Sequence, residues 1–539
     1  MTQSTREMRG NRFWRTAAIV FIVAAALHGL ATLAQFAPTW DEPDVVTHGR
    51  AMLSWYRSGF RDTTVAFGTN ILYGGAESLT TVVVQAVTHV DIYTAQHAVC
   101  LAFGIAGLAV AYYAGAALLS PLTGFLAAVF LWLTPIYFGY SRNDPKDLPY
   151  AVMSFTALAC MRWLWDYWPT PPKRVWVPCA VCGGLMLGLR LGGVLTFAYL
   201  GLSCAAWFLV RRRQLSDVRA MAVTLVKIGC LAFVVLALCW PAVIYRPLRA
   251  PHQALLATKS YSFASFSERF NGRGISSVRT PWTYVPVWFG VTLPDFYAIA
   301  ALLSPLALWQ AVRARRTWNA DAATPVFIVV LATAILFPAT MFVVFHTRLY
   351  DGTRLVLFMV PIFAVLAALS TGAVLQSPLP AAIRGVAAIA IAAALAVTAA
   401  DMWRLHPYES VYFNRLSGGL AVQGARFDTD YWGMSIREAT DWLIAHPPAS
   451  MPGRIRVANC GDTFQTVDPL ARTAELRERF ESVHMDSRPD IVVATTRFRC
   501  NERVAGRVLY VVERMNAPLC YVIAVDHDRY VDPRVFDDY

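Results

Sequence analysis

Long apolar runs without charged residues recur between Phe13 and about Ala400 of this chain. Many of these runs approach the roughly 20 residues that an α-helix needs to cross a bilayer. Of all residues 56% are hydrophobic and 15% are charged, whereas a soluble chain carries about 25% charged residues. Since a soluble core does not need such runs, the sequence predicts an all-α polytopic membrane protein.

The apolar runs predict about eleven crossings. We place them approximately at 14–36, 96–118, 120–140, 148–165, 175–189, 191–210, 221–243, 290–312, 323–345, 355–376 and 381–400. The run from Val175 to Val210 would form a helix of about 54 Å, too long for one crossing of about 30 Å. Two glycine pairs and Arg190 interrupt it, so we expect two short helices joined by a tight hairpin.

The formal net charge of +12 does not indicate binding to nucleic acid, because the arginines lie mainly beside apolar runs. Clusters such as Arg211–Arg213 and Arg313–Arg316 are typical of cytoplasmic loops. With the N-terminus inside, all strong basic clusters fall on the cytoplasmic side and residues 401–539 fall outside. The first apolar run has no small-residue cleavage site after it, so we expect a retained helix.

The pattern changes after about Asp401, where polar residues become frequent. Ser435 to Glu438 form a capping box that predicts a helix to about Ala445. Short apolar stretches near 454–458, 490–494, 508–512 and 520–525 predict strands. We therefore expect a transmembrane domain at 1–400 and a C-terminal α/β domain at 401–539. The cysteines of this tail permit one disulfide, with the pairing open among Cys460, Cys500 and Cys520.

Two adjacent carboxylates, Asp41 and Glu42, follow the first apolar run. There they could deprotonate an acceptor hydroxyl or hold a divalent cation. Equally, either could cap a helix that has Pro43 in its first turn. Both interpretations stay open on spacing alone. The long outer segments that contain these residues and 244–289 could also hold amphipathic helices on the membrane surface.

Two short outer loops keep cations beside aspartates. The loop at 141–147 contains Arg142, Asp144, Lys146 and Asp147, and the loop at 346–354 ends at Arg354. These charges could neutralise one another in ion pairs with a purely structural role, or they could bind a phosphate group. Arg354 would stand at the head of a helix, where an anion is favoured.

Eight short motifs in order then resemble the GT-C glycosyltransferases, in the bacterial branch related to protein O-mannosyltransferases and the lipid A aminoarabinose transferase. They are Trp40–Pro43, Tyr73–Glu77, Asn143–Pro149, Gly188–Gly193, Pro281–Trp288, Tyr350–Arg354, His406–Asn414 and Asp430–Ser435. The chain departs from this pattern at Thr283, where histidine is frequent, and at Thr353 and Leu355, which leaves donor specificity open.

The resemblance implies an inverting transfer of a sugar from a polyprenyl phosphate to a lipid, glycan or protein acceptor. It places the site at the periplasmic face of a bacterial inner membrane, within cell-envelope synthesis. Asp41 would match the catalytic base, with Glu42 beside it. Glu77, Asp144 and Asp147 would support the acceptor or a metal. The phosphate ligands that we expect are Arg142, Lys146 and Arg354.

No cofactor is required for this reaction, although Asp41 and Glu77 are candidates for holding a divalent metal ion. The chain has no GxSxG motif, phosphate-binding P-loop or dinucleotide fingerprint. A transporter or flippase of a polyprenyl-linked sugar is the alternative, but it would favour charges within the crossings and two similar halves. A structural membrane protein whose tail binds a partner is a third reading, which does not explain the paired acids.

Overall fold

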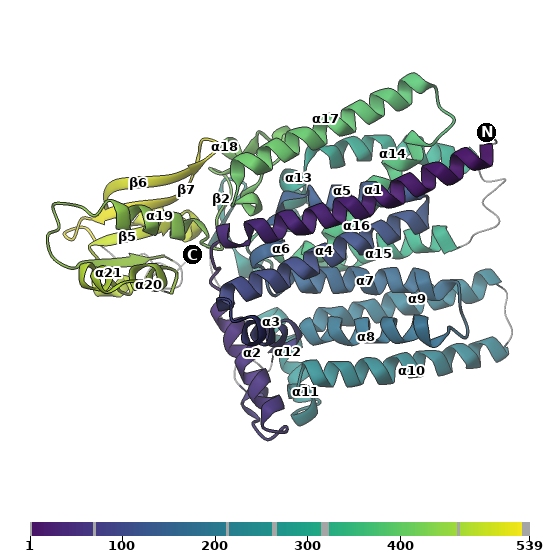
Figure 1. Cartoon of the computed structure of the whole chain (residues 1–539), viewed down its shortest axis with the longest axis horizontal. Helices are drawn as coiled ribbons and strands as arrows, with labels where there is room; N and C mark the ends of the chain where they lie inside the picture. Colours follow the sequence, from purple (N-terminus) through teal and green to yellow (C-terminus); the bar gives the residue numbers. More distant parts are fainter. Residues whose placement is uncertain are drawn as a thin grey trace.

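The structure is a computed structural model that describes residues 3–67, 72–211, 215–260, 267–313, 323–460 and 464–530. Its apolar part is a bundle of helices that lie side by side (Figure 1). The helices of this bundle are α1 (Gln3–Thr32), α4 (Ile92–Leu118), α5 (Pro121–Trp132), α6 (Pro135–Asn143), α7 (Asp147–Trp165), α8 (Lys173–Leu189), α9 (Leu195–Arg211), α10 (Leu215–Cys239), α13 (Tyr284–Thr292), α14 (Asp295–Arg313), α15 (Ala323–Val344), α16 (Val360–Leu375) and α17 (Ala381–Leu405).

Seven helices in the described ranges are long and apolar enough to cross a membrane, and up to nine spans result if each of two bent pairs is one span. The bent pairs are α5 with α6, at 67°, and α13 with α14, at 106°. The prediction of a polytopic helical protein is therefore confirmed. The sequence predicts two crossings more than these nine, and the two additional crossings correspond to α7 and α8. Both helices lie parallel to their neighbours in Figure 1.

The two breaks predicted in this part of the chain are both present. Helix α8 ends at Leu189, a single turn of 3₁₀ helix covers Leu191–Val194, and α9 begins directly after it. Arg190 has an extended backbone, with φ −148° and ψ 140°, because it lies in the hairpin and not in either helix. The second break separates α6 from α7 at Pro145, since a proline disfavours helical geometry in the residue before it.

One end of the bundle carries most of the remaining structure. Helix α2 (Glu42–Arg57) runs across this end, beside α3 (Ala76–Thr88), α11 (Ala242–Tyr245) and α12 (Arg249–Ser260) (Figure 1). A hairpin of β1 (Ser267–Phe270) and β2 (Arg273–Ser276), which the sequence analysis did not predict, lies at the same end. The N-terminus lies at the opposite end of the bundle.

The C-terminal unit follows α18 (Gly419–Gln423) and contains a five-stranded sheet with the order β4-β3-β5-β7-β6. Its central strands β3 and β5 are parallel, whereas β7 is antiparallel to both β5 and β6. The four predicted strands are present, and β4 is an additional short edge strand. The elements are α19 (Ser435–Ala445), β3 (Ile455–Asn459), α20 (Phe464–Leu470), α21 (Ala474–Arg479), β4 (Phe480–Ser482), β5 (Ile491–Thr495), α22 (Cys500–Arg503), β6 (Gly506–Arg514) and β7 (Ala517–Val525).

The start of α19 differs in detail from the predicted capping box. Asp430 caps the helix, because its carboxylate accepts the backbone N–H groups of Met434 at 3.1 Å and Ser435 at 2.7 Å. Glu438 instead bonds the Tyr408 hydroxyl and Arg514. The helix itself was therefore predicted correctly, but the residue that caps it was not.

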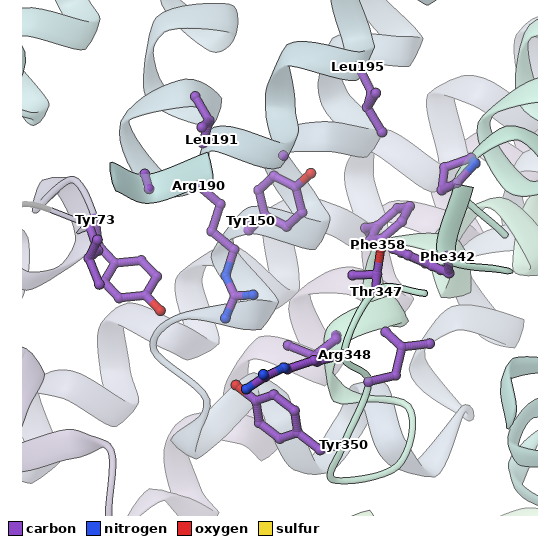
Figure 2. Close-up of a pocket in the computed structure, with 16 residues that line it drawn as sticks. Tyr73, Tyr150, Arg190, Leu191, Leu195, Phe342, Thr347, Arg348, Tyr350 and Phe358 are labelled. Atoms are coloured by element: carbon purple, nitrogen blue, oxygen red, sulfur yellow. The ribbon is translucent and has the colours of Figure 1, made fainter. Parts of the chain in front are cut away.

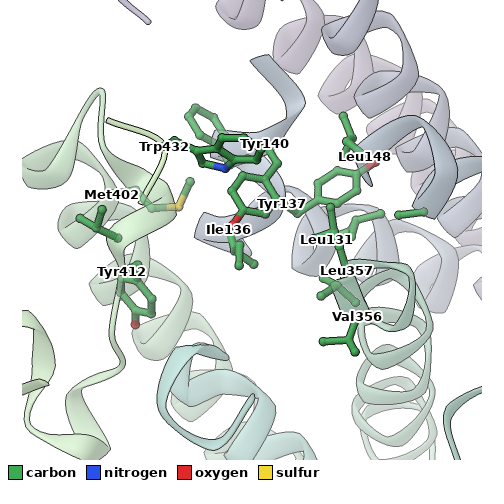
Figure 3. Packing of buried hydrophobic residues seen from close by; sticks show 14 of the residues in the cluster. Leu131, Ile136, Tyr137, Tyr140, Leu148, Val356, Leu357, Met402, Tyr412 and Trp432 are labelled. Carbon is green, nitrogen blue, oxygen red and sulfur yellow. The ribbon is translucent and has the colours of Figure 1, made fainter. Parts of the chain in front are cut away.

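The bundle and the C-terminal unit share one buried apolar cluster. Figure 3 shows members of this cluster: Tyr137, Leu357 and Met402 belong to the bundle, and Tyr412 and Trp432 belong to the segment that leads into the C-terminal unit. The same cluster continues into the sheet. Burial of this continuous apolar surface stabilises the contact between the two parts. The single disulfide among the described residues joins Cys460 to Cys500, while Cys520 is buried in β7.

Candidate active site at one end of the bundle

Four segments that are distant in the sequence bring their charged residues together at the α2 end of the bundle. The turn before α2 supplies Asp41, the α6–α7 connection supplies Lys146 and Asp147, and the loop before α16 supplies Arg354. The α8–α9 hairpin adds Arg190, which binds Asp147. Arg354 also binds Asp351 of its own loop, and Asp351 binds Arg497, which comes from a fifth segment, in the C-terminal unit. We call the set formed by Asp41, Lys146, Asp147, Arg190, Asp351, Arg354 and Arg497 the ion-pair network.

Asp41 precedes α2 but makes no capping hydrogen bond with its side chain. Its carboxylate instead binds the Arg354 guanidinium and lies 3.4 Å from the Lys146 ammonium. Burial alone would raise the pKa of Asp41, but the charges of Arg354 and Lys146 outweigh it and lower the pKa to about 2. Asp41 is therefore ionised and held between two cations.

Arg354 connects three carboxylates. Besides Asp41, it donates from Nε to Asp147 Oδ2 at 2.8 Å and from Nη1 to Asp351 Oδ2 at 3.4 Å. Its guanidinium carbon also lies 4.4 Å from the ring centroid of Trp432. A planar guanidinium with several fixed donors suits this role, and it equally suits recognition of a phosphate group.

A second group of acids lies on the other side of Lys146, around a small pocket of about 70 Å³. We call it the carboxyl pocket. Its polar lining includes Asp44, His48, Glu77, Ser78 and Lys146. Glu77 is 2% exposed; its Oε1 accepts the Thr81 hydroxyl at 3.0 Å, and its Oε2 has no partner among the described residues.

Two acids of this second group, Glu77 and Asp144, have raised pKa values, in contrast to Asp41. Burial raises the pKa of Glu77 to about 8, although the Thr81 hydrogen bond opposes it. Burial and the nearby charge of Asp147 likewise raise the pKa of Asp144 to about 8. Burial and Lys146 lower the pKa of His48 to about 4. At neutral pH the carboxyl pocket is therefore lined by the protonated carboxyl of Glu77 and the uncharged imidazole of His48, with the Lys146 side chain beside them.

Glu42 lies apart from Asp41 although the two are neighbours in the sequence. It is fully buried, and its Oε1 accepts the backbone N–H of Thr39 at 2.8 Å. Its Oε2 lies 3.1 Å from Nε2 of His97 on α4. Glu42 thus fixes the turn that presents Asp41, and it does not face the ion-pair network.

A cavity of about 220 Å³ opens beside the ion-pair network, and we call it the amphipathic cavity. Figure 2 shows Arg190, Tyr73, Arg348 and Tyr350 gathered at one side of it. Leu195, Phe342 and Phe358 line the cavity away from these polar groups. A cavity with a cationic and hydroxyl-bearing part and an apolar part matches a ligand with a charged head and a hydrocarbon tail.

Arg142 does not join the ion-pair network. Its side chain is fully buried, with the guanidinium carbon 3.8 Å from the ring centroid of Phe138 and 4.8 Å from that of Trp132. Nη1 donates to the Phe138 carbonyl oxygen at 2.8 Å. The role of Arg142 in phosphate binding stays a prediction, and these contacts give it a structural role inside the bundle.

The residues around Asp41 do not fit a divalent metal ion. Within the described ranges no group of three or more histidine, cysteine, aspartate or glutamate side chains could hold one. Arg354 and Lys146 also occupy the carboxylate of Asp41, so a metal ion there would face two cations. We therefore derive no chemical step through a metal.

Of the predicted site residues, Asp41, Lys146, Asp147 and Arg354 come together, with Glu77 and Asp144 in the adjacent group. The sequence analysis assigned no role to Arg190, Asp351 or Arg497. For Arg190 the sequence did contain a signal, because burying an arginine in an apolar hairpin costs free energy unless a partner balances its charge. Arg497 had none, since the C-terminal tail contains many arginines.

No family model and no curated protein matches this chain. Among solved structures, ArnT from Cupriavidus metallidurans bound to undecaprenyl phosphate aligns over 94% of this chain and 97% of its own, with 15% identity and a TM-score of 0.48. The Archaeoglobus fulgidus oligosaccharyltransferase aligns over 86% of this chain and 64% of its own, with 11% identity and a TM-score of 0.48. Mycobacterial arabinofuranosyltransferase AftD aligns over 94% of this chain and 40% of its own, with 13% identity and a TM-score of 0.40.

These three proteins are GT-C glycosyltransferases, the family that the sequence motifs resemble. The TM-scores all lie below 0.5.

Proposed function

We propose that this protein is an inverting glycosyltransferase that moves a sugar from a polyprenyl phosphate to an acceptor at the outer face of a bacterial inner membrane. The observation that carries the proposal is that Asp41 binds Arg354 and Lys146 within one ion-pair network. The same network includes Arg190, which lines the amphipathic cavity, and Lys146, which lines the carboxyl pocket. One base and one phosphate site next to each other are what such a displacement requires.

The donor would bind in the amphipathic cavity, with its phosphate near Arg190 and Arg354 and its prenyl chain along Leu195, Phe342 and Phe358. Asp41 would take the proton of the acceptor hydroxyl while the acceptor oxygen attacks the anomeric carbon. The bond from that carbon to the phosphate oxygen breaks, and its electron pair leaves with the polyprenyl phosphate. The guanidinium groups stabilise this leaving group.

A carboxylate with a pKa of about 2 is a weak base, so the donor itself must change the surroundings of Asp41. A phosphate that enters beside Arg354 competes with Asp41 for the same guanidinium donors. Asp41 then loses part of the attraction that lowers its pKa, and its basicity rises. Donor binding would therefore precede activation of the base.

The acceptor would approach from the carboxyl pocket. The protonated carboxyl of Glu77 can donate a hydrogen bond, and its unpartnered Oε2 can take part in binding a hydroxyl group. A protonated Glu77 and an uncharged His48 favour a neutral hydroxyl over an anion beside them. This supports a sugar-like or alcohol acceptor end, whichever molecule carries it.

The proposed topology has eleven crossings, with α7 and α8 counted as spans. Counts of seven, nine and eleven crossings are all odd, so each would put the C-terminal unit on the side opposite the N-terminus. The basic clusters that adjoin α1, α9 and α14 in the sequence support a cytoplasmic location for the N-terminal end of the bundle. The C-terminal domain at 401–539 would then be periplasmic.

The test is transfer from radiolabelled polyprenyl-phosphate sugars by the purified protein, with the wild type beside Asp41→Asn. We expect Asp41→Asn to lose about 100- to 10,000-fold in transfer, as for other general bases. Because the competing carboxylate is gone, Asp41→Asn should bind the donor at least as tightly as the wild type, measured by photocrosslinking.

Three results would contradict parts of the proposal. Full transfer by Asp41→Asn would remove Asp41 as the base and leave the enzyme class intact. Donor binding by the wild type without transfer to any acceptor extract or to water would favour the transporter. Absence of both donor binding and transfer in the wild type would reject the proposed function.

A further inference from the structure

Arg497 of the C-terminal unit reaches into the ion-pair network of the bundle. It follows β5 directly, in the turn Arg497–Arg499, and is 8% exposed. Its Nη2 binds Asp351, at 2.8 Å from Oδ1 and 3.1 Å from Oδ2. Asp351 in turn accepts from Arg354. Arg497 of the C-terminal unit and Arg354 of the bundle therefore bind the same carboxylate, that of Asp351.

Arg497 also contacts the turn that carries Asp41. Its guanidinium carbon lies 3.9 Å from the ring centroid of Trp40, the residue directly before Asp41. Trp40 packs near Trp432, with ring centroids 6.5 Å apart, and Trp432 packs against Arg354. Arg497 therefore supports both members of the Asp41–Arg354 ion pair, one through Asp351 and the other through Trp40.

The fold of the C-terminal unit holds Arg497 in this position from several sides. Nη1 donates to the Tyr431 carbonyl oxygen at 3.2 Å. The preceding Thr496 hydroxyl lies 2.9 Å from that of Thr429. Three residues further along, Cys500 is joined to Cys460 at the end of β3. These contacts limit the motion of the turn that presents the arginine.

We propose that Arg497 is a positioning residue of the active site, and that the C-terminal unit is required to complete the ion-pair network. Arg497 holds Asp351, which orients Arg354 toward Asp41 and the donor phosphate, and it keeps the Trp40 turn in place. This inference rests on the proposed function for its effect on transfer, but its structural part can be measured without any substrate.

The matched control is Arg499, which lies two residues away in the same turn. Its side chain is 53% exposed and binds Glu502, so it has the same charge and an ion-pair partner outside the ion-pair network. We compare Arg497→Met, Arg497→Lys and Arg499→Met in the full-length protein. Arg497→Lys keeps the charge but loses the planar guanidinium, whose Nη1 donates to Tyr431 while Nη2 binds Asp351.

The first readout is hydrogen exchange of the purified protein without substrate. Peptides that cover 39–43 and 349–354 should exchange faster in Arg497→Met than in the wild type, while Arg499→Met should match the wild type. The double variant Cys460→Ser/Cys500→Ser should show the same pattern in weaker form. Unchanged exchange of both peptides in Arg497→Met, with the protein folded, would overturn the proposal even if the enzyme is active.

The second readout is the pH dependence of transfer. The charged and titratable groups that face Asp351 are Arg497, Arg354, Asp41, Glu268, Asp428, Tyr284 and Tyr350. Burial raises the pKa of Asp351 above its usual value, although Arg497 and Arg354 oppose this rise. Without Arg497 the pKa rises further, Asp351 becomes protonated at higher pH, and it releases Arg354.

We therefore expect the acid limb of the transfer rate to move to higher pH in Arg497→Met, with kcat roughly 10- to 100-fold lower at pH 7. Arg497→Lys should fall between this variant and the wild type. A change of rate in Arg497→Met without a change in the pH profile would indicate a loss of folded protein only and would contradict the positioning role. Absence of transfer in the wild type, with the exchange pattern as expected, would reject the proposed function and leave the structural inference standing.

Discussion

The two sides of the Lys146–Asp147 turn carry buried carboxyl groups in opposite protonation states. On the side of the ion-pair network, Asp41 has a pKa of about 2 because Arg354 and Lys146 lie against it. On the side of the carboxyl pocket, the pKa values of Glu77 and Asp144 rise to about 8. Burial acts in the same direction on all three acids.

The difference lies in the groups that contact each carboxyl. Asp41 has two cations at ion-pair distance, whereas Glu77 has a hydroxyl and Asp144 has backbone N–H groups. Without a cation, desolvation favours the neutral acid. The charged side is therefore suited to a phosphate, and the uncharged side to a hydroxyl group. The predictions below test this division.

The largest effect is expected from Arg354→Lys, which keeps the charge of the network. Lysine cannot reproduce the separate donor atoms that bind Asp41, Asp147 and Asp351. Loss of these charge-assisted bonds should weaken binding of the donor phosphate by roughly 100-fold and transfer by more. Photocrosslinking of a polyprenyl-phosphate sugar measures the first and radiolabel transfer the second. Wild-type affinity in this variant would show that the phosphate does not bind at Arg354.

A smaller effect is expected from Arg190→Gln, at the border of the amphipathic cavity. Arg190 lines this cavity and binds Asp147, but it does not contact Asp41. Its loss should raise the KM for the donor by about tenfold, with kcat changed less, because one charge-assisted contact to the phosphate is removed. An equal fall of kcat with unchanged KM would mean that Arg190 acts on the base and not on donor binding.

Glu77→Gln should have little effect at pH 6.5, where Glu77 is protonated in the wild type. We expect transfer within about threefold, because glutamine also donates a hydrogen bond and has the same shape. The raised pKa means that the folded state holds a proton that the unfolded chain releases above its usual pKa of 4.5. The contribution of Glu77 to stability is therefore greatest at low pH and is lost as the pH rises to about 8.

Thermal unfolding between pH 5 and pH 9 measures this dependence. The wild type should lose stability with rising pH more steeply than Glu77→Gln, while Asp144 keeps part of the slope in both proteins. Identical slopes would show that Glu77 ionises in the folded protein as it does in the unfolded chain. In that case the carboxyl pocket would not be an uncharged site.

Asp41 and Glu42 show how far the sequence could predict this site. The adjacent acids after the first helix predicted a chemical site, and the structure brings one of them, Asp41, together with Arg354 and Lys146. Their separation could not be predicted. It depends on α4 presenting His97 to Glu42 while the loop before α16 presents Arg354 to Asp41, and both partners come from distant parts of the chain.

The same reasoning applies to the fold. Apolar length predicted the crossings, and the interruption at Arg190 predicted the α8–α9 hairpin, because these are local properties of the chain. The contact of Arg497 with Asp351 depends on how the C-terminal sheet docks onto the bundle. The buried cluster shared by the two parts fixes this docking, and no local pattern in the sequence indicates it.

The smallest effect on donor binding is expected from Arg142→Met, although the sequence analysis expected Arg142 to bind the phosphate. Methionine can fill the space between Phe138 and Trp132 and needs no hydrogen bonds. Replacing a buried charged side chain with a well-packed apolar one is often neutral or stabilising. Donor affinity should therefore stay within about twofold of the wild type, in contrast to the tenfold change expected for Arg190→Gln. A comparable loss in both variants would mean that Arg142 reaches the phosphate, and the charged side of the site would then extend into the bundle.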